Sequence, residues 1–573
     1  MADEVKLHKN ESIKAASRQL RGTLAEELHS DAQGFGADSE QLIKFHGFYQ
    51  QEDRDQRYQK NPDGTPVARQ TSFMVRSRIP GGRLTAGQFL AELELGDKFG
   101  NGTLRVTTRQ ALQLHGVLKS SLRDTIHQIN EIKLSTLAAC GDVNRNVMCC
   151  PAPYKHNGVF DELQRFAEEL ADHFRPKTTA YWELWVRDEE GEHQPVASCE
   201  PVDEPIYGAT YLPRKFKMAV ALPDDNCVDV LANDMGYLAI VEQGRIVGYN
   251  VVVGGGMGMS PSVKKTFPAL AKPLAFVTPD QAIAVGEAVV KVQRDNGNRT
   301  DRKQARLKYV IAQWGIEKFA REVEKYYGQP LTPPRPLEIT GVDDHIGWHE
   351  QGDGRLFLGI NIENGRIKDE GKLRIKTGLR TIVQKFQMPI RLTALQAVLL
   401  CDVEPRDRPE IDRLLKEHGI LAAEELTLLR RYSAACPAWP TCGLAITESE
   451  RALPGVLDAL EVELSRLGLV GERISVHMTG CPNGCARPYT PDIGFVGRGA
   501  GEKYTVYLGG NALGTRLAFV YRDYVPKAEI VPVLSPVLTR FREERRPGEA
   551  LGDYCARVGA ASLGATGAGP DAT

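Results

Sequence analysis

The chain has 573 residues, of which 72 are Lys or Arg and 74 are Asp or Glu, so its formal charge is −2. That length is too great for a single hydrophobic core and predicts several domains. The balance of charge argues against a generally basic, nucleic-acid-binding protein, and no apolar run is long enough to cross a bilayer. We therefore expect neither nucleic acid nor a membrane as a partner.

The first 60 residues are polar and highly charged, with a helical pattern between Ser17 and His29. They predict an arm that lies on the body of the protein. The chain begins Met-Ala-Asp-Glu and lacks the apolar stretch of a secretory signal. We expect a cytoplasmic protein, in which clustered cysteines indicate metal binding more than disulfide bonds.

Basic residues recur in the strand-like stretches that follow, and these are Arg76, Arg78, Arg105, Arg109, Arg145, Arg214, Lys215 and Lys217. Alternate side chains of a strand share a face, so Lys215 and Lys217 should lie together, and so should Arg105 and Arg109. Taken singly, each charge is more often solvated. Gathered around one cleft, they repel one another unless an anion neutralises them. The basic segment 298–308 predicts a solvated helix.

Two matches in the same order indicate an internal duplication. The stretch 104–114 resembles 390–400, with Arg105 on Arg391 and Gln110 on Gln396. The stretches 217–223, 234–237 and 253–256 resemble 474–482, 492–495 and 508–511. A long-period duplication predicts two similar halves, whose interface is a natural cofactor site. Chance similarity between strand-like segments is the alternative.

Helices and strands alternate within each half, which predicts an α+β fold with α/β-type layers. Helices are predicted over 163–173, 279–295 and 451–467, and strands over 217–222, 246–253 and 504–508. The Gly/Ala/Ser-rich residues 558–573 predict a disordered tail.

Four cysteines in two close pairs form the strongest motif, Cys436-Pro-Ala-Trp-Pro-Thr-Cys442 and Cys481-Pro-Asn-Gly-Cys485. Their spacing favours an iron–sulfur cluster over zinc, whose ribbons prefer tighter pairs, or over unligated core cysteines. Prolines stiffen both loops, while Gly480 and Gly484 allow close approach of the backbone to an inorganic core. We expect Cys140, Cys199, Cys227, Cys401 and Cys555 to be buried hydrophobes, and Cys149 and Cys150 to be structural.

These motifs together resemble the sirohaem-dependent sulfite and nitrite reductases, specifically the assimilatory sulfite reductase haemoprotein. The resemblance runs from Leu20-Arg-Gly-Thr to about Val558, and its most specific part is Cys436-x5-Cys442 with Thr479-Gly-Cys-Pro-Asn-Gly-Cys-Ala-Arg-Pro488. It implies pseudo-twofold halves, with a ferredoxin-like bipartite domain and two larger α/β-type domains. The expected boundaries are an arm (1–60), ferredoxin-like halves (61–135 and 336–410), reductase domains (136–335 and 411–557) and a tail (558–573).

The resemblance also implies roles for individual residues. Cys436, Cys442, Cys481 and Cys485 would hold one 4Fe–4S cluster, and Cys485 would also ligate the sirohaem iron. Arg76, Arg145, Lys215 and Lys217 would bind the substrate anion. The residues expected to contact the sirohaem or lie close to the cofactors are Arg105, Thr107, Arg109, Gln110, His115, Asn483, Asn511 and Arg516. Leu395 occupies the second-half position of Arg109, which suggests a single sirohaem in a formerly symmetric crevice.

The implied function is the six-electron reduction of sulfite to hydrogen sulfide in sulfate assimilation. No flavin or nicotinamide domain is evident, so the electrons would come from an NADPH-dependent flavoprotein subunit or from ferredoxin. The nearest alternative is a nitrite reductase on the same scaffold. An alternative from another class is a zinc-stabilised scaffold without redox chemistry.

Overall fold

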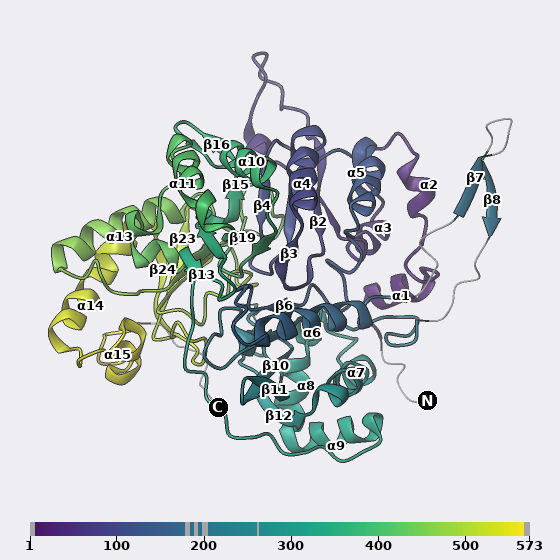
Figure 1. Ribbon diagram of the computed structural model, residues 1–573. Helices are drawn as coiled ribbons and strands as arrows, with labels where there is room; N and C mark the ends of the chain where they lie inside the picture. Colours follow the sequence, from purple (N-terminus) through teal and green to yellow (C-terminus); the bar gives the residue numbers. More distant parts are fainter. Residues whose placement is uncertain (1–5, 178–183, 188–192, 198–203, 261–262, 567–573) are drawn as a thin grey trace.

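The structure is a computed structural model that describes residues 6–177, 184–187, 193–197, 204–260 and 263–566. Within these ranges the fold is α+β. It contains four five-stranded sheets with helices packed against them. The helices α4 and α10 lie together above the centre of the molecule, while α13 to α15 and α6 to α9 cover two larger lobes (Figure 1).

Two of the sheets form a bipartite domain. The first has the order β1 (Phe48–Glu52), β2 (Thr71–Ser77), β5 (Leu112–Val117), β4 (Leu104–Val106) and β15 (Arg366–Ile367). The second has the order β13 (Gly347–Glu350), β14 (Leu356–Ile360), β19 (Val398–Val403), β18 (Ile390–Leu392) and β3 (Arg83–Leu84). Each sheet thus takes its last strand from the other half, through the pairs β15–β4 and β3–β18. This exchange ties the two halves together.

One hydrophobic core serves both of these sheets. The helices that pack into it are α4 (Ala86–Lys98), α5 (Lys119–Glu131), α10 (Ile375–Phe386) and α11 (Arg408–Glu417). The small hairpin of β16 (Asp369–Glu370) and β17 (Leu373–Arg374) precedes α10.

The other two sheets belong to the larger lobes. The first lobe has the order β12 (Lys272–Val277), β11 (Arg245–Val253), β10 (Met235–Glu242), β9 (Met218–Ala221) and β6 (Met148–Cys149). The second has the order β20 (Ser433–Ala435), β21 (Val476–Thr479), β22 (Ile493–Gly499), β23 (Lys503–Leu508) and β24 (Phe519–Pro526). In both, the strands β6, β9 and β10, or β20, β21 and β22, are parallel, and the remaining pairs are antiparallel. The sheets therefore repeat each other strand by strand.

Each lobe has its own core and helices. The first contains α6 (Val159–His173), α7 (Pro279–Asn296), α8 (Leu307–Trp314) and α9 (Ile316–Tyr327). The second contains α12 (Leu428–Arg431), α13 (Leu453–Leu467), α14 (Ile530–Glu544) and α15 (Leu551–Val558). A separate hairpin is formed by β7 (Leu184–Arg187) and β8 (His193–Ala197).

Two glutamines show the duplication at the level of single hydrogen bonds. The side-chain amide of Gln110 donates to the Leu392 carbonyl at 2.9 Å and accepts the Cys149 N–H at 3.0 Å. Gln396 repeats this arrangement: its amide donates to the Val106 carbonyl at 3.3 Å and accepts the Ala435 N–H at 3.1 Å. Both glutamines have positive φ, +52° and +70°. Each half therefore binds the other through an equivalent buried glutamine. The predicted duplication is confirmed.

The predicted helices and strands agree with α6, α7, α13, β9, β11 and β23. Local sequence explains where α4 and α7 begin. Thr85 and Gln88 form a capping box at the start of α4, as do Thr278 and Gln281 at the start of α7. Each box satisfies backbone N–H groups that a helix start leaves without partners.

Two predictions for the ends of the chain were wrong. The patch Ser17–His29 is not one helix, because Arg18 to Leu20 have positive φ and separate α1 (Lys9–Ala16) from α2 (Leu24–Leu28). The segment after Val558 is ordered up to residue 566, where Leu563 is buried against the second lobe and the Thr566 N–H donates to Tyr521. Arg540 also donates to the Ser562 carbonyl, so one buried leucine and several backbone contacts hold this small-residue segment; residues 567–573 lie outside the described ranges.

None of the described helices combines the length and the apolar character needed to cross a membrane.

Candidate functional site

Two lysines lead into strand β9. Lys215 and Lys217 lie on either side of the buried Phe216, so their side chains share a face, as the alternation predicts. The backbone N–H of Lys217 donates to the carboxylate of Asp234 at 2.9 Å, just before β10. The parallel pairing of β9 with β10 therefore fixes where this pair of cations stands.

Other positively charged side chains surround the two lysines. Burial, followed by the neighbouring Arg214, lowers the pKa of Lys215 to about 7. Burial, followed by Lys215 and Arg109, lowers the pKa of Lys217 well below its ordinary value. Cys485 acts in the opposite direction on both. Like charges this close favour an anion between them.

Three arginines complete the cationic group. Arg109 donates to Asn233 at 2.8 Å and to the Asn146 carbonyl at 2.6 Å, and burial and Arg145 lower its pKa to about 9. Arg145 and Arg76 come from different segments, yet both lie 3.4 Å from the carbonyl of Ala139. The structure thus brings together the four residues predicted to bind the anion, with Arg109 beside them.

Two buried cations that were predicted to be solvated belong to the same region. Arg306 forms two hydrogen bonds with Asp234, at 2.8 and 2.7 Å. Lys308 donates to the Gly256 and Gly258 carbonyls at 2.9 and 2.7 Å, and burial lowers its pKa to about 6. The solvated helix over 298–308 was wrong because Asp234 and the glycine loop supply partners from a distant part of the chain. The repeated Asp234-Met-Gly-Tyr motif was the signal that marked this aspartate.

The two cysteine pairs lie in loops of the second lobe. Cys436 directly follows β20, and its sulfur accepts the Gly480 N–H at 3.4 Å. Asn483 donates to the Cys481 sulfur at 3.4 Å. Burial and then Cys485 raise the pKa of Cys442, and burial with the same neighbour raises that of Cys481 to about 12. Cys485 thus acts on the pKa of the other three cysteines, which shows that the two loops bring the four residues into one neighbourhood.

Cys485 differs from the other three. Cys436 and Cys481 are buried and Cys442 is half-buried, whereas Cys485 is exposed. It acts to raise the pKa of Lys215 and Lys217, and its carbonyl accepts the Thr108 hydroxyl at 2.9 Å. The cysteine group and the cationic group thus meet at Cys485.

Residues of the first ferredoxin-like half lie along the same junction. Arg105 donates to Glu450 at 2.8 Å and to the carbonyl of Ala435, the residue before Cys436. It does not share a strand face with Arg109 as predicted, because β4 ends at Val106 and a turn follows. Thr107 holds that turn by accepting the Arg109 and Ala111 N–H groups at 3.2 Å.

Several buried polar atoms near this junction have no hydrogen-bond partner within the described residues. They are Nε of Arg109, both amide atoms of Asn144, both ring nitrogens of His115 and the hydroxyl of Thr479. Burial and the nearby Arg366 hold the pKa of His115 well below its ordinary value, so the ring is neutral. Buried polar groups are normally paired, so this set fits a site that a polar cofactor completes.

The remaining predicted residues lie elsewhere. The Gln110 amide is engaged by backbone groups of both halves. Asn511 lines a small cavity with Leu395, Ser475 and His477. Arg516 pairs with Asp553 at 2.6 Å near the surface. The structure does not place Asn511 and Arg516 with the lysines, and their contact with a cofactor stays a prediction.

The stretch 1–60, predicted as an arm, contributes β1 to the first sheet, and the residues after β1 reach the cysteine loop. Arg54 donates to the carbonyls of Cys442 and Ala445 at 2.9 and 2.8 Å, and its guanidinium lies 3.7 Å from the centre of the Trp439 ring. Asp55 accepts the Trp439 indole N–H at 2.5 Å. The arm therefore braces the loop that carries Cys436 and Cys442.

Two family models match this chain. Residues 140–331 and 430–565 match the nitrite and sulphite reductase 4Fe-4S domain, and residues 67–132 and 349–418 match the nitrite/sulfite reductase ferredoxin-like half domain. The chain belongs to the nitrite and sulphite reductase family. The duplicated halves seen in the hydrogen bonds are the halves of this family.

Relatives from several bacteria match over almost the whole chain. The sulfite reductase (ferredoxin) of Synechococcus elongatus is 44% identical over 567 residues, which cover 97% of this chain and 90% of the relative. The sulfite reductase (NADPH) hemoprotein beta-component of Geobacillus thermodenitrificans is 46% identical over 550 residues, with 96% and 95% covered. The solved structure of the Mycobacterium tuberculosis NirA protein has a TM-score of 0.78 at 24% identity and covers 97% of both chains, which shows the shared fold.

Proposed function

We propose that this protein reduces sulfite to hydrogen sulfide in sulfate assimilation. The observation that carries the proposal is the position of Cys485, the exposed member of a four-cysteine group, which lies close enough to Lys215 and Lys217 to raise the pKa of both. A thiolate metal centre and an anion-binding group therefore meet in one crevice. Relatives at 44% and 46% identity are named sulfite reductases, which supports sulfite as the substrate.

Sirohaem and one 4Fe–4S cluster are the cofactors that the residues fit. Cys436, Cys442, Cys481 and Cys485 would hold the cluster, and Cys485 would also ligate the sirohaem iron. The carboxylates of a sirohaem are suitable acceptors for the unpaired Nε–H of Arg109 and the unpaired side-chain NH2 of Asn144. When bound, these groups supply the redox chemistry by which six electrons reach the sulfur.

The side chains of this protein would bind sulfite and manage its protons. Lys215, Lys217, Arg76 and Arg145 would hold the negatively charged oxygens. A lysine ammonium combines a compact charge with protons that it can donate, so Lys215 is suited to protonate oxygen atoms as they leave as water. The guanidinium groups stay charged and keep the remaining oxygens in place.

Nitrite is the second candidate substrate. It is also a small anion, and the family match names nitrite and sulphite reductases together. The stretches Asn144-Arg-Asn-Val and Pro213-Arg-Lys-Phe-Lys resemble sulfite reductases more closely. We therefore assign sulfite as the main substrate and nitrite as a side activity.

The electron donor would be a partner protein. The relative from Synechococcus elongatus is named for ferredoxin, and the one from Geobacillus thermodenitrificans for NADPH. We propose that either a reduced ferredoxin or an NADPH-dependent flavoprotein subunit delivers the electrons. We expect the reaction to take place in the cytoplasm.

An anaerobic assay tests the proposal. The purified protein should be strongly coloured and should form sulfide from sulfite with a reduced viologen dye as donor. The same preparation should then be assayed with reduced ferredoxin and with an NADPH-flavoprotein subunit, and with nitrite in place of sulfite. A colourless, zinc-containing protein without sulfide formation would contradict the proposal, and faster turnover of nitrite than of sulfite would reverse the substrate assignment.

A further inference from the structure

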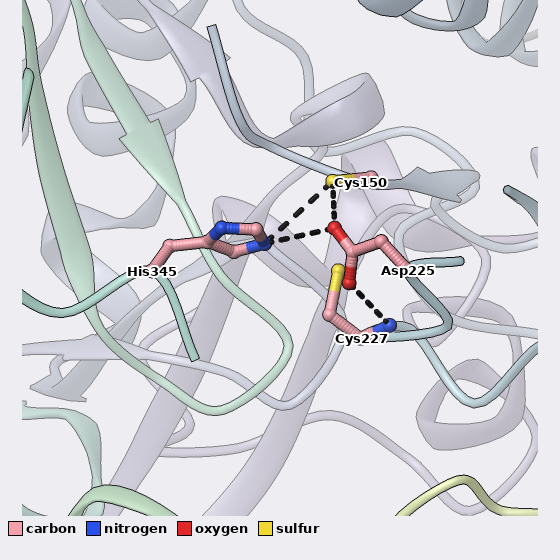
Figure 2. Close-up of side chains that lie close together, drawn as sticks. All are labelled: Cys150, Asp225, Cys227 and His345. Carbon is pink, nitrogen blue, oxygen red and sulfur yellow. Dashed lines mark hydrogen bonds and ion pairs between the residues drawn. The ribbon is translucent and has the colours of Figure 1, made fainter. Parts of the chain in front are cut away.

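A second group of metal-binding side chains lies in the first lobe, apart from the four-cysteine group. It consists of Cys150, Asp225, Cys227 and His345, all buried. One ligand atom from each residue lies within 4.8 Å of all the others. Figure 2 shows both sulfurs, the carboxylate and the imidazole ring directed toward a common centre.

Two of three distances between the ligand atoms are close to those around a small tetrahedral ion, and the third is shorter. The Cys150 sulfur lies 3.6 Å from Nε2 of His345, and that nitrogen lies 3.1 Å from Oδ2 of Asp225. Zinc bonds of about 2.0–2.3 Å place neighbouring ligand atoms roughly 3.3–3.8 Å apart. The third distance, from the Cys150 sulfur to Oδ2 of Asp225, is 2.7 Å. Binding of an ion would lengthen this distance by about 0.8 Å.

Hydrogen bonds and a nearby carboxylate orient two of these ligands toward the centre. Oδ1 of Asp225 accepts the Cys227 N–H at 3.3 Å and the Asp343 N–H at 3.2 Å, which leaves Oδ2 facing the centre. His345 has φ of +59°, and its Nδ1, which has no hydrogen-bond partner among the described residues, lies 3.9 Å from the Asp343 carboxylate. A carboxylate behind a histidine ligand is a common outer-shell arrangement in metal sites.

The internal duplication gives an independent reason to expect a metal here. Gln110 accepts the Cys149 N–H and Gln396 accepts the Ala435 N–H, so the next residues, Cys150 and Cys436, occupy equivalent positions.

The second sulfur has an equivalent too. Cys227 lies six residues beyond Ala221, the end of β9, and Cys485 lies six residues beyond Thr479, the end of β21. Two residues further on, Asp229 and Arg487 both have positive φ, +49° and +55°. Cys150 and Cys227 are therefore the first-half counterparts of two of the cluster cysteines.

We propose that Cys150, Asp225, Cys227 and His345 bind one zinc ion. Two thiolates, one imidazole and one carboxylate are a donor set that zinc accepts in tetrahedral geometry, and the buried site leaves no open position for a substrate. Binding releases the thiol protons of both cysteines and the proton on Nε2 of His345 to solvent, and it leaves the oxidation state of every atom unchanged. Cys227 is buried as predicted, but it is not isolated, because Cys150 and His345 reach it from distant segments.

The ion would join three parts of the chain. Cys150 follows β6, Asp225 and Cys227 follow β9, and His345 stands two residues before β13 of the bipartite domain. Zinc would therefore fix the first lobe to the start of the second ferredoxin-like half. The proposal does not depend on sulfite reduction.

The test uses the full-length holoenzyme, produced in zinc-supplemented medium and purified without chelators. Elemental analysis should find about one zinc per chain in addition to iron. X-ray absorption at the zinc edge should show two sulfur ligands at about 2.3 Å and two nitrogen or oxygen ligands at about 2.0–2.2 Å.

Neighbouring cysteines supply a matched control. Cys150→Ala should lower zinc to less than a tenth of the wild-type content without lowering iron. Cys149→Ala should retain zinc, because the Cys149 sulfur points to the other side and lies 3.3 Å from Gln164. His345→Gln should behave like Cys150→Ala.

Three results would overturn the proposal, and none requires a variant that folds. They are a wild-type holoenzyme without zinc, a zinc spectrum with four sulfur ligands, which would place the metal at Cys436, Cys442, Cys481 and Cys485, and a disulfide between Cys150 and Cys227 found by mass spectrometry. Loss of sulfide formation with zinc still bound would contradict only the proposed function.

Discussion

The two lobes share a frame but line their crevices with different chemistry. In the first lobe, Asp234 accepts the backbone N–H of Lys217 and pairs with Arg306. In the second lobe, Asp492 holds the same position before its strand, but it accepts the N–H and hydroxyl of Ser475 at 2.8 and 2.5 Å. An equivalent carboxylate thus anchors a cation in one lobe and a neutral hydroxyl in the other.

The same loss of charge occurs at the start of the crevice. Arg109 in the first half corresponds to Leu395 in the second, which lines a small cavity with Ser475 and His477. The Arg487 guanidinium at this cavity is already neutralised by Asp229. A few side chains on an unchanged backbone therefore decide which crevice attracts an anion, and the predictions below test that difference.

The largest effect should come from the point where the cysteine and cationic groups meet. Cys485→Ser should abolish sulfide formation, because an alcohol is a poor ligand for iron and would uncouple sirohaem from the cluster. Sulfide production and the visible spectrum measure this. Cys555→Ser, a buried cysteine of α15, is the control and should keep the wild-type rate. Near-normal turnover of Cys485→Ser would remove the central role given to this residue.

The next largest effect should come from removing one cation. Lys217→Met makes the first crevice resemble the second, where Ser475 stands, and should slow sulfite reduction by about 10²–10³-fold. Iron content and the visible spectrum should not change, because the cysteines are intact. Lys272→Met, an exposed lysine of β12, is the control. An unchanged rate for Lys217→Met would show that this lysine does not take part in sulfite reduction.

The shared frame predicts matched losses of stability. Gln110→Leu and Gln396→Leu each leave a buried backbone N–H and carbonyl groups without their partner, and each should lower the free energy of unfolding by about 2 kcal/mol. Denaturant unfolding of both variants measures this. If Gln110→Leu alone also lost sirohaem, this glutamine would serve the cofactor as predicted from the sequence; equal losses of stability with sirohaem retained would show that it is a joint between the halves.

Sequence patterns were sufficient where the chemistry depends on neighbouring residues. The spacing of Cys436/Cys442 and Cys481/Cys485 is enough to predict a metal site. The repeated stretches 104–114 and 390–400 are enough to predict the duplication. Alternation predicts Lys215 and Lys217 on one face, and the buried Phe216 between them and the effect of Lys215 on the pKa of Lys217 agree with it.

The sequence failed where partners come from distant segments. Arg306 looks like one charge among many until Asp234 is placed beside it, 72 residues away in the chain. Cys150 and His345 are 195 residues apart and meet only because β6 and the start of the second half adjoin. The exchange of β3 and β15 between sheets is likewise decided by tertiary packing and leaves no local pattern.

The smallest effect concerns the protonation of Lys215. Its pKa of about 7 belongs to a crevice without an anion, and a bound anion would raise it. Sulfite binding would then take up a proton above pH 7, so the affinity should be highest below pH 7 and fall by up to about tenfold per pH unit above it. Lys215→Arg keeps the charge at every pH and should flatten this fall.

Titrations of sulfite binding between pH 6 and 9 compare the two proteins. The protonation of sulfite itself contributes equally to both, so the difference between the curves isolates the lysine. The second crevice provides a control, because its residue at the position of Lys217 is the neutral Ser475. Ser475→Ala should therefore give the same pH dependence of sulfite binding as the wild type. Identical curves for wild type and Lys215→Arg would mean that Lys215 is fully charged across this range. Carboxylates already present in the first crevice, and not sulfite, would then neutralise its positive charge.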